Sequence, residues 1–266
     1  LCKVPVLGVV PYYRGIYIEE EDSVMLESKN REAAAGKINV AVILLRHLSN
    51  FTDFNVLERD ERVHLYYTNN VDDITKADII LLPGSKNTLD DLYELRRNGV
   101  AQAILKASQE GATVMGICGG YQMMGLEVRD PEGVEGNVRM LPGLGLLPVI
   151  TTMQGDKVTR QVEFTFDGTE ALCKGYEIHM GRTVPAEGSP PSPFNQLADG
   201  REDGYQDKQK KCLGTYIHGI LDNQPFIDFL LAPYIGKLGQ QTFDYTAFKE
   251  EQYDKLAEHV RKHINM

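Results

Sequence analysis

The sequence predicts an α/β fold, with a mostly parallel central sheet that carries helices on both faces and an antiparallel extension. Apolar strand-like runs alternate with helical segments through the first half of the chain, which is typical of parallel strands joined by helical crossovers. After residue 145 the apolar runs become shorter and alternate with polar residues, which favours antiparallel strands. The 266 residues, 42% of them hydrophobic, suffice for one large domain, or for one domain with a small appendage.

The elements of the first half follow from apolar runs and helix signals. The run at 38–45 (INVAVILL) is nearly unbroken and rich in β-branched residues, the pattern of a strand buried on both faces. Similar runs predict strands at 4–10, 63–67, 78–82 and 113–117. Helical spacing behind good N-terminal residues predicts helices at 88–96 and 100–110, and a short helix that ends at Met124.

The later elements are shorter. Alternating runs predict the antiparallel strands at 148–153, 161–166, 176–180 and 212–217. Two helices are predicted at 225–238 and 245–264, and the polar stretches at 19–22 and 29–36 indicate a linker or a short helix.

Composition excludes several classes of protein. The net charge of −10 and the absence of a Lys/Arg stripe argue against nucleic-acid binding. No apolar run reaches the ~18 residues that a membrane-spanning helix needs, and the first residues do not form a signal peptide. None of the four cysteines forms a C-x-x-C pair, so we expect no metal site, no disulfide framework and a reducing, cytoplasmic location.

The strongest chemical signal is the stretch 115–122 (MGICGGYQ), where a predicted strand ends and a helix begins. A tight strand-to-helix turn of this kind pushes one side chain, here that of Cys118, out of the top of the sheet. The helix N-terminus favours a thiolate and aims backbone N–H groups at a developing oxyanion, so Gly119 is expected to donate there. The alternative is a buried structural cysteine in a packing turn.

A second strand end carries Pro83-Gly84-Ser85. Since the carboxyl ends of parallel strands meet at one edge of a sheet, the N–H of Ser85 is expected to face Cys118 as a second oxyanion donor, beside Gly84. The segment resembles a phosphate-binding loop but lacks the required spacing, and a plain strand–helix turn is the other alternative.

A third strand ends in 214–219 (GTYIHG), and its His218 is the candidate base for the thiol. His179, in 175–181 (GYEIHMG), is a rival whose direction the alternation of the strand leaves open. The other histidines lack a strand-end setting and are expected to be surface or structural residues.

Together these motifs resemble the class I, triad-type glutamine amidotransferases, and within them the cobyric acid synthase family of cobalamin biosynthesis. Supporting segments, spread over residues 4–230, include 5–11 (PVLGVVP), 49–54 (SNFTDF), 82–88 (LPGSKNT) and 176–181 (YEIHMG). The resemblance implies that Cys118 attacks the side-chain amide of glutamine, that His218 serves as base, and that Gln122 contacts the substrate.

The resemblance also implies a larger enzyme in which an upstream ligase domain uses ATP and Mg²⁺ to activate corrinoid carboxylates. Residues 1–30 are then the tail of that ligase domain and a linker, and 31–266 the amidotransferase domain, with no cofactor of its own. The implied partners are glutamine, the ligase domain and, through it, the corrinoid acceptor.

One position departs from many class I members, which have a Glu two residues after the base where this chain has Ile220. His218 must then be oriented by another group: a backbone carbonyl, a carboxylate elsewhere in the chain, such as Asp222 or Glu177, or a group from the partner domain. The segment 49–54 is either an ordinary loop with a capped helix start at Thr52 or Asp53, or an interdomain contact. Alternative functions are an amidotransferase acting on cobyrinic acid or a cell-wall lipid precursor, a catalytically silent binding domain of the same fold, and a thiol hydrolase.

Overall fold

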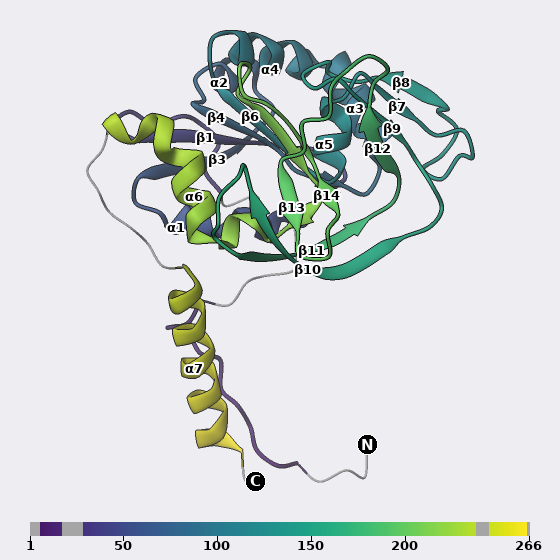
Figure 1. Ribbon diagram of the computed structural model, residues 1–266. Coiled ribbons are helices and arrows are strands. Elements are labelled where there is room, and N and C mark those ends of the chain that lie inside the picture. The colour runs from purple at the N-terminus through teal and green to yellow at the C-terminus, as the bar shows by residue number, and fades with distance from the viewer. Residues whose placement is uncertain (1–5, 18–28, 238–244, 265–266) are drawn as a thin grey trace.

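A six-stranded sheet forms the centre of the computed structural model, which describes residues 6–17, 29–237 and 245–264 (Figure 1). Its order is β15-β16-β6-β4-β1-β3. All neighbours are parallel except β15, which pairs antiparallel with β16 at one edge. The strands are β1 (Ile38–Ile43), β3 (Val63–Thr68), β4 (Ile79–Leu82), β6 (Thr113–Ile117), β15 (Tyr205–Asp207) and β16 (Cys212–Thr215).

Apolar clusters cover both faces of this sheet, and β1 shows why its sequence is an unbroken apolar run. Val40 and Val42 point into one cluster, whereas Ala41 and Ile43 point into the other. The Ala41 side is covered by α2 (Val71–Ile74), α3 (Thr88–Arg97), α4 (Val100–Gln109) and α5 (Gly119–Met124). The Val40 side is covered by α1 (Asn55–Arg59), α6 (Gln224–Leu231) and a second sheet. The predicted fold class is thereby confirmed.

The antiparallel extension lies mainly in that second sheet, whose order is β14-β13-β10-β11-β17. Its strands are β10 (Val158–Phe166), β11 (Cys173–His179), β13 (Asn195–Leu197), β14 (Glu202–Asp203) and β17 (Ile217–His218). A third sheet contains β7 (Glu127–Arg129), β8 (Met140–Pro142), β9 (Val149–Thr152) and β12 (Arg182–Pro185). A short ribbon pairs β2 (Leu48–Ser49) with β5 (Gly84–Ser85).

The prediction for 212–217 as one strand of the extension is wrong. The run divides at Tyr216: β16 joins the central sheet parallel to β6, and β17 joins the second sheet antiparallel to β11. All four residues of β16 are buried, so this part of the run has the character of an inner parallel strand. The change of sheet carries the chain from beside Cys118 directly to His218.

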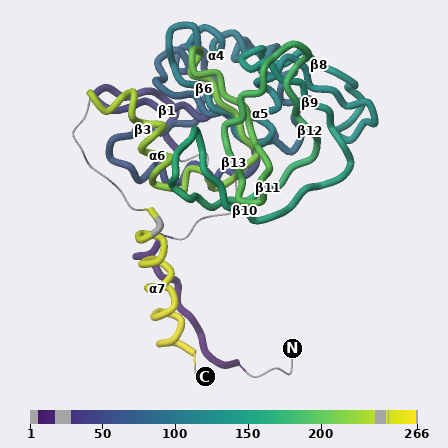
Figure 2. Tube along the Cα trace, viewed as in Figure 1, coloured from purple at the N-terminus to yellow at the C-terminus, as the bar shows by residue number. Residues whose placement is uncertain are grey.

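The first and last described segments lie side by side and project from the body of the molecule (Figures 1 and 2). We call residues 6–17 together with α7 (Tyr245–His263) the stalk. The helix was expected at 245–264, whereas the strand expected at 4–10 has only an isolated bridge at Gly8, its residues 4–5 lying outside the described part. The acidic stretch at 19–22 and residue 238 also lie outside it. Among the described residues, no helix combines the length and apolarity needed to cross a membrane.

Candidate active site

Cys118 occupies a strained turn between β6 and α5. Its φ of 52° and ψ of −112° are unusual for a residue with a side chain. The flanking glycines make the turn possible by their small size: a Cβ on Gly120 would lie 2.0 Å from the carbonyl oxygen of Leu82. The Cys118 N–H donates to the Thr215 carbonyl at 2.8 Å, which ties the turn to β16. The expected nucleophile-elbow geometry is therefore present.

The sulfur of Cys118 borders a cavity of about 370 Å³, a size that suits an amino acid. The side chain is half-buried, and its Sγ lies 3.6 Å from the carbonyl oxygen of Ile178, to which the thiol donates. Because Cys118 is the N-cap residue of α5, the positive end of that short helix faces the sulfur.

His218, at the end of β17, is buried and is not among the residues that line this cavity. It is 1% exposed, and its ring stacks on Tyr176 with ring centroids 5.2 Å apart. Gly84 lies beside the imidazole: a Cβ there would be in ordinary contact with Cε1 of His218, at 3.5 Å, but too close to Oγ of Ser49, at 2.9 Å. The Nε2 atom is buried and has no hydrogen-bond partner among the described residues, which leaves it available to the reacting groups.

The group that orients His218 is Asp53, which the sequence analysis considered only as a helix cap. Asp53 Oδ2 lies 2.7 Å from His218 Nδ1, and Oδ1 accepts from the N–H of Gly219 at 3.0 Å. The carboxylate is 5% exposed, in the 3₁₀ helix Phe51–Phe54 that follows β1 and β2. Both earlier candidates are engaged elsewhere: Glu177 pairs with arginines and Asp222 with Lys249.

The electrostatic setting favours a charged imidazole. Burial disfavours that form, but the Asp53 carboxylate and then the Cys118 sulfur outweigh it and raise the pKa of His218 from 6.5 to about 10. The sulfur lies close enough to act on the ring, although outside hydrogen-bond geometry in this arrangement. Asp53 and His218 therefore form a buried hydrogen-bonded pair, and the Cys118 sulfur adds to the rise in the pKa of the same imidazole.

The predicted oxyanion residues meet beside Cys118. The amide nitrogen of Ser85 lies 2.8 Å from the position that a Cβ on Gly119 would occupy, so the two backbones nearly touch. The Ser85 hydroxyl is held by Asp91 at 2.6 Å, which fixes the turn that carries the amide. The structure thus brings Gly84, Ser85 and Gly119 together; whether their amides bind an oxyanion stays a prediction.

Gln122 lines the cavity, but its amide is occupied by the protein. Its oxygen accepts from Thr88 Oγ1 at 3.0 Å, and its nitrogen donates to the Met180 carbonyl at 2.9 Å and to Tyr216 Oη at 3.2 Å. A direct contact with substrate, as the resemblance implied, stays a prediction that requires one of these bonds to exchange. As placed, Gln122 joins α3, α5 and the end of β11.

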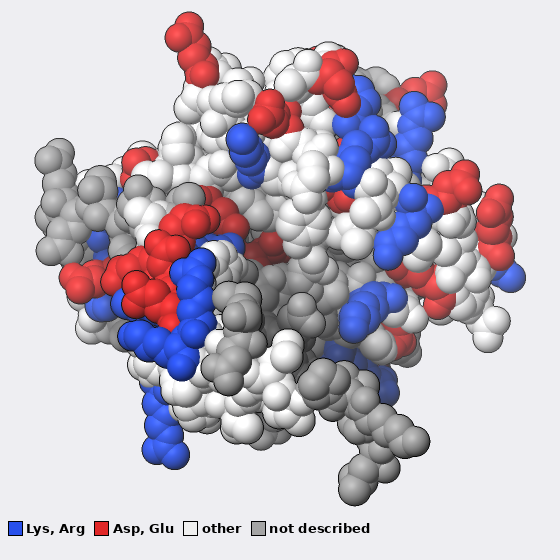
Figure 3. Space-filling view, turned by 90° about the horizontal axis from the view of Figure 1, so that it is seen from below, with Lys and Arg blue, Asp and Glu red and all other residues white. Residues whose placement is uncertain are grey.

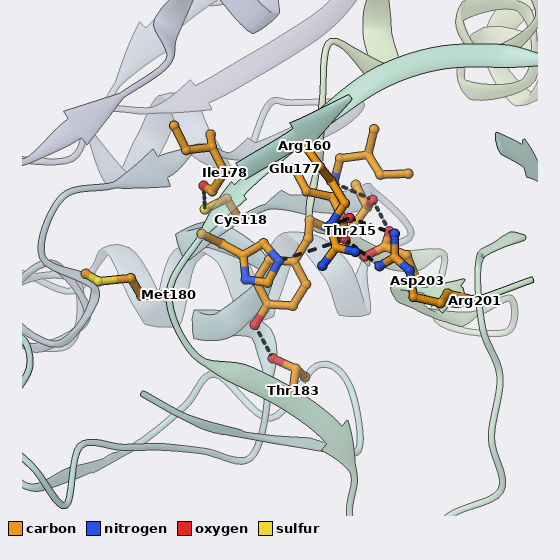
Figure 4. A network of polar contacts seen from close by, with 12 residues as sticks. Cys118, Arg160, Glu177, Ile178, Met180, Thr183, Arg201, Asp203 and Thr215 are labelled. Carbon is orange, nitrogen blue, oxygen red and sulfur yellow. Dashed lines mark hydrogen bonds and ion pairs between the residues drawn. The ribbon is translucent and has the colours of Figure 1, made fainter. Parts of the chain in front are cut away.

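His179, the rival base, lies in the wall between the Cys118 cavity and a second cavity of about 580 Å³. Its ring stacks on Tyr216 at 3.8 Å, and Nε2 lies 3.9 Å from Glu177. Glu177 forms ion pairs with Arg160 and with Arg201, each at 3.0 Å, and Figure 4 shows these three residues near one another. Asp53 contacts His218, and the Cys118 sulfur raises the pKa of His218. These observations favour His218 over His179 as the base.

The remaining histidines lie away from the cavity lining and contact other groups. His47 pairs with Asp91, His64 meets the Glu32 carbonyl, and His259 and His263 lie on α7. No group of three or more His, Cys, Asp or Glu side chains in the described ranges is arranged to hold a metal ion.

A carboxylate that the sequence analysis missed also lines the cavity. Glu135 lies on a loop held by the fully buried Asp130, which accepts from the N–H groups of Val134 and Glu135. Glu135 itself accepts from the N–H of Leu89 at 3.1 Å, and burial raises its pKa against the effect of that bond. No motif marks this residue, because only the folded loop brings it to the cavity.

A strand-end cysteine beside a histidine–aspartate pair, on an α/β sheet, is the arrangement of a triad-type thiol enzyme. Comparison with known families narrows this class: residues 39–226 match the CobB/CobQ-like glutamine amidotransferase domain. The chain belongs to that family.

Curated relatives agree with this assignment, and solved structures share the fold. The chain is 71% identical over 266 residues to a cobyric acid synthase of Bacteroides fragilis and 56% identical over 268 residues to one of Parabacteroides distasonis. Both matches cover 100% of this chain but 54% of the relative, so the chain spans about half the length of these proteins. The fold resembles PurLQS from Thermotoga maritima (TM-score 0.52, 19% identity, 68% of this chain and 87% of that one) and a second glutamine amidotransferase (0.52, 16%, 73% and 97%).

Proposed function

We propose that this chain hydrolyses glutamine to glutamate and ammonia through a thioester on Cys118. The observation that carries the proposal is the strained strand-end Cys118 at a cavity of amino-acid size, together with the buried His218–Asp53 pair whose imidazole pKa responds to the sulfur. Family membership supplies the substrate class, and the three side chains supply the chemistry.

The first half of the reaction forms the thioester. The Cys118 sulfur attacks the side-chain amide carbon of glutamine while His218 holds the proton that the thiol gives up. The oxyanion develops between the N–H groups of Gly119 and Ser85, each such donor contributing about 3 kcal/mol to lowering the barrier. His218 then returns its proton to the departing nitrogen, and ammonia leaves.

The second half restores the enzyme. Water attacks the thioester carbon, the C–S bond breaks, and glutamate leaves with Cys118 reprotonated. Asp53 keeps the imidazole in one tautomer through both halves, because its bond to Nδ1 directs Nε2 at the reacting atoms.

The same cavity carries groups that match the charged end of glutamine. The Glu135 carboxylate suits the α-ammonium group, while Lys157 and Lys86 lie at the exposed rim, where an α-carboxylate can be met. With Cys118 at the other end, this polarity orients the side-chain amide toward the sulfur.

The names of the relatives favour a role in a longer protein. We propose that the ammonia serves ATP-dependent amidation of corrinoid carboxylates in a cobyric acid synthase, with ATP and Mg²⁺ bound outside this chain. The division into residues 1–30 and 31–266 belongs to this proposal. The acceptor is the part that a related amidotransferase would change, whereas the glutaminase chemistry would stay the same.

The direct experiment measures ammonia and glutamate released from glutamine by the longer protein. Cys118→Ala is expected to abolish release, whereas Cys173→Ala, a change at a buried cysteine away from the cavity, is expected to leave it near normal in protein that folds equally well. Undiminished release by the Cys118 variant would contradict the proposal. Absence of release from the wild type, with glutamine supplied, would favour a catalytically silent domain.

A further inference from the structure

The stalk exposes apolar side chains of a kind that folded proteins normally bury. The exposed fractions are 82% for Val6, 59% for Leu7, 79% for Val9, 44% for Val10 and 89% for Tyr12. Five such residues within seven positions form a contiguous patch rather than scattered surface residues, and patches of this kind mark interaction sites.

The segment is fixed in place by its backbone and by Tyr13 and Tyr17, not by these five side chains. It runs antiparallel to α7: Tyr17 contacts Phe248 and Gln252, Tyr13 stacks on His259, and Gly8 bridges to Ile264. A Cβ on Gly8 would lie 2.0 Å from the His263 carbonyl oxygen, so the backbone is in close contact with the helix end.

The apolar face of α7 is also incompletely covered. Its start is anchored, since Tyr245 is 2% exposed within the core and Arg59 lies over the Phe248 ring. Beyond Gln252, no described residue of α7 is buried, although Leu256 and Val260 continue the apolar face. The opposite face carries exposed charges at Glu250, Glu251, Asp254, Glu258, Arg261 and Lys262. In the view from below, Lys, Arg, Asp and Glu side chains gather on one side of the centre, next to a surface of uncharged residues (Figure 3).

A single extended segment on a single helix cannot form a core of its own, because an apolar face must be covered by a second layer. Residues 6–10 are apolar on both sides of the backbone, which is the pattern of an inner strand of a parallel sheet rather than of a surface segment. Apart from the bridge at Gly8, their backbone has no strand partner in the described part of the chain. This open edge and the exposed side chains therefore point to a missing sheet.

The relatives indicate where that sheet comes from. They have nearly as much polypeptide again outside the matched region, and the match covers this chain from end to end. Wherever the additional polypeptide joins, before residue 1 or after residue 266, the stalk contains the described residues nearest to the junction. This additional polypeptide is covalently attached close to the exposed apolar patch, so it is the one occupant that we assign to the patch.

We propose that the stalk is the surface on which the other half of the longer protein packs, with residues 6–10 pairing as a strand of that half's sheet and α7 packing against it. The inference rests on the longer-protein part of the proposed function. The experiments that test it do not depend on the chemistry at Cys118, so the stalk proposal and the proposed glutaminase function can fail separately.

Hydrogen exchange on the longer protein tests the pairing. Amides of residues 7–10 are expected to exchange at least about a hundredfold more slowly than those of the open loop around Gly188. Exchange as fast as in that loop would overturn the proposal. Protection that disappears on dilution would overturn it too, because it would assign the surface to a second copy.

A pair of substitutions tests the apolar contact in the same protein. Val9→Glu is expected to lower the melting temperature and to speed exchange at residues 7–10, because it places a charge in the proposed interface. The matched control is Leu172→Glu, a residue 60% exposed on the body, which is expected to change neither. Equal behaviour of the two variants would overturn the proposal, and the wild-type exchange pattern decides the matter if the Val9 variant does not fold.

Discussion

Replacing Asp53 by asparagine should remove the orientation of His218 while leaving the shape of the site almost intact. The oxygen of the introduced amide can still accept from the N–H of Gly219, but its NH₂ group can donate to Nδ1 of His218. That donation places the ring proton on Nε2, the atom that has to accept the proton of Cys118. The variant therefore has a folded site with the wrong tautomer.

The expected size of the effect follows from the charge that Asp53 stabilises. The rise of the His218 pKa from 6.5 to about 10 corresponds to about 5 kcal/mol in favour of the imidazolium. Burial opposes that rise, and Asp53 raises this pKa more than Cys118 does. We expect kcat for glutamine hydrolysis to fall about a thousandfold, with a small change in KM, because the loss affects proton transfer more than binding.

The assay is steady-state ammonia release as a function of glutamine concentration and pH. Asp60→Asn is the matched control, since Asp60 is also a buried aspartate in a close ion pair, with Arg62, outside the cavity. The control should lose stability but keep kcat. If Asp53→Asn kept more than about a tenth of wild-type kcat, the orienting role would be refuted.

Three further outcomes are expected. Burial opposes the charged form of Glu177, but His179, Arg201 and Arg160 lower its pKa to about 2. The Glu177 carboxylate therefore stabilises the fold above pH 4.5, and this contribution is lost as the pH falls toward 2. Glu177→Gln should then cost up to about 3 kcal/mol in urea unfolding at pH 7 and much less at pH 2, and an equal cost at both would contradict the pairing. Gly120→Ala should destabilise the elbow by about 3 kcal/mol or more, whereas Gly155→Ala, which has open space around it, should be near neutral in thermal unfolding. Glu135→Gln should raise KM for glutamine, yet barely change the hydrolysis of an analogue that lacks the α-amino group; an equal effect on both substrates would exclude a contact with the ammonium group.

The sequence predicts the parallel sheet, the approximate bounds of its inner strands, and the strand-end positions of Cys118 and His218, because these depend on local patterns. The strand at 113–117 ends where the apolar run meets Gly-rich residues, and the structure ends β6 at the same residue. The division of 212–217 between two sheets could not be predicted, since both parts are apolar and only pairing with β6 and β11 separates them.

Asp53 escaped prediction for a related reason. It lies 165 positions before His218 in the chain, in a segment that indicates a loop with a capped helix start at Thr52 or Asp53, or an interdomain contact. A strand-end rule would have drawn attention to it, because the segment follows the first strand of the sheet at the edge where Cys118 also lies. The sequence alone does not tell which of several strand-end carboxylates reaches the imidazole.

The central claim, that Cys118 is a nucleophile activated by His218 and Asp53, is tested most directly by mass spectrometry after exposure to a glutamine-mimicking electrophile. One adduct is expected, on Cys118, with Cys173 and Cys212 unmodified as internal references, and labelling should slow strongly in His218→Ala and Asp53→Asn. An unlabelled Cys118, or labelling at the same rate in the wild type and both variants, would contradict the account.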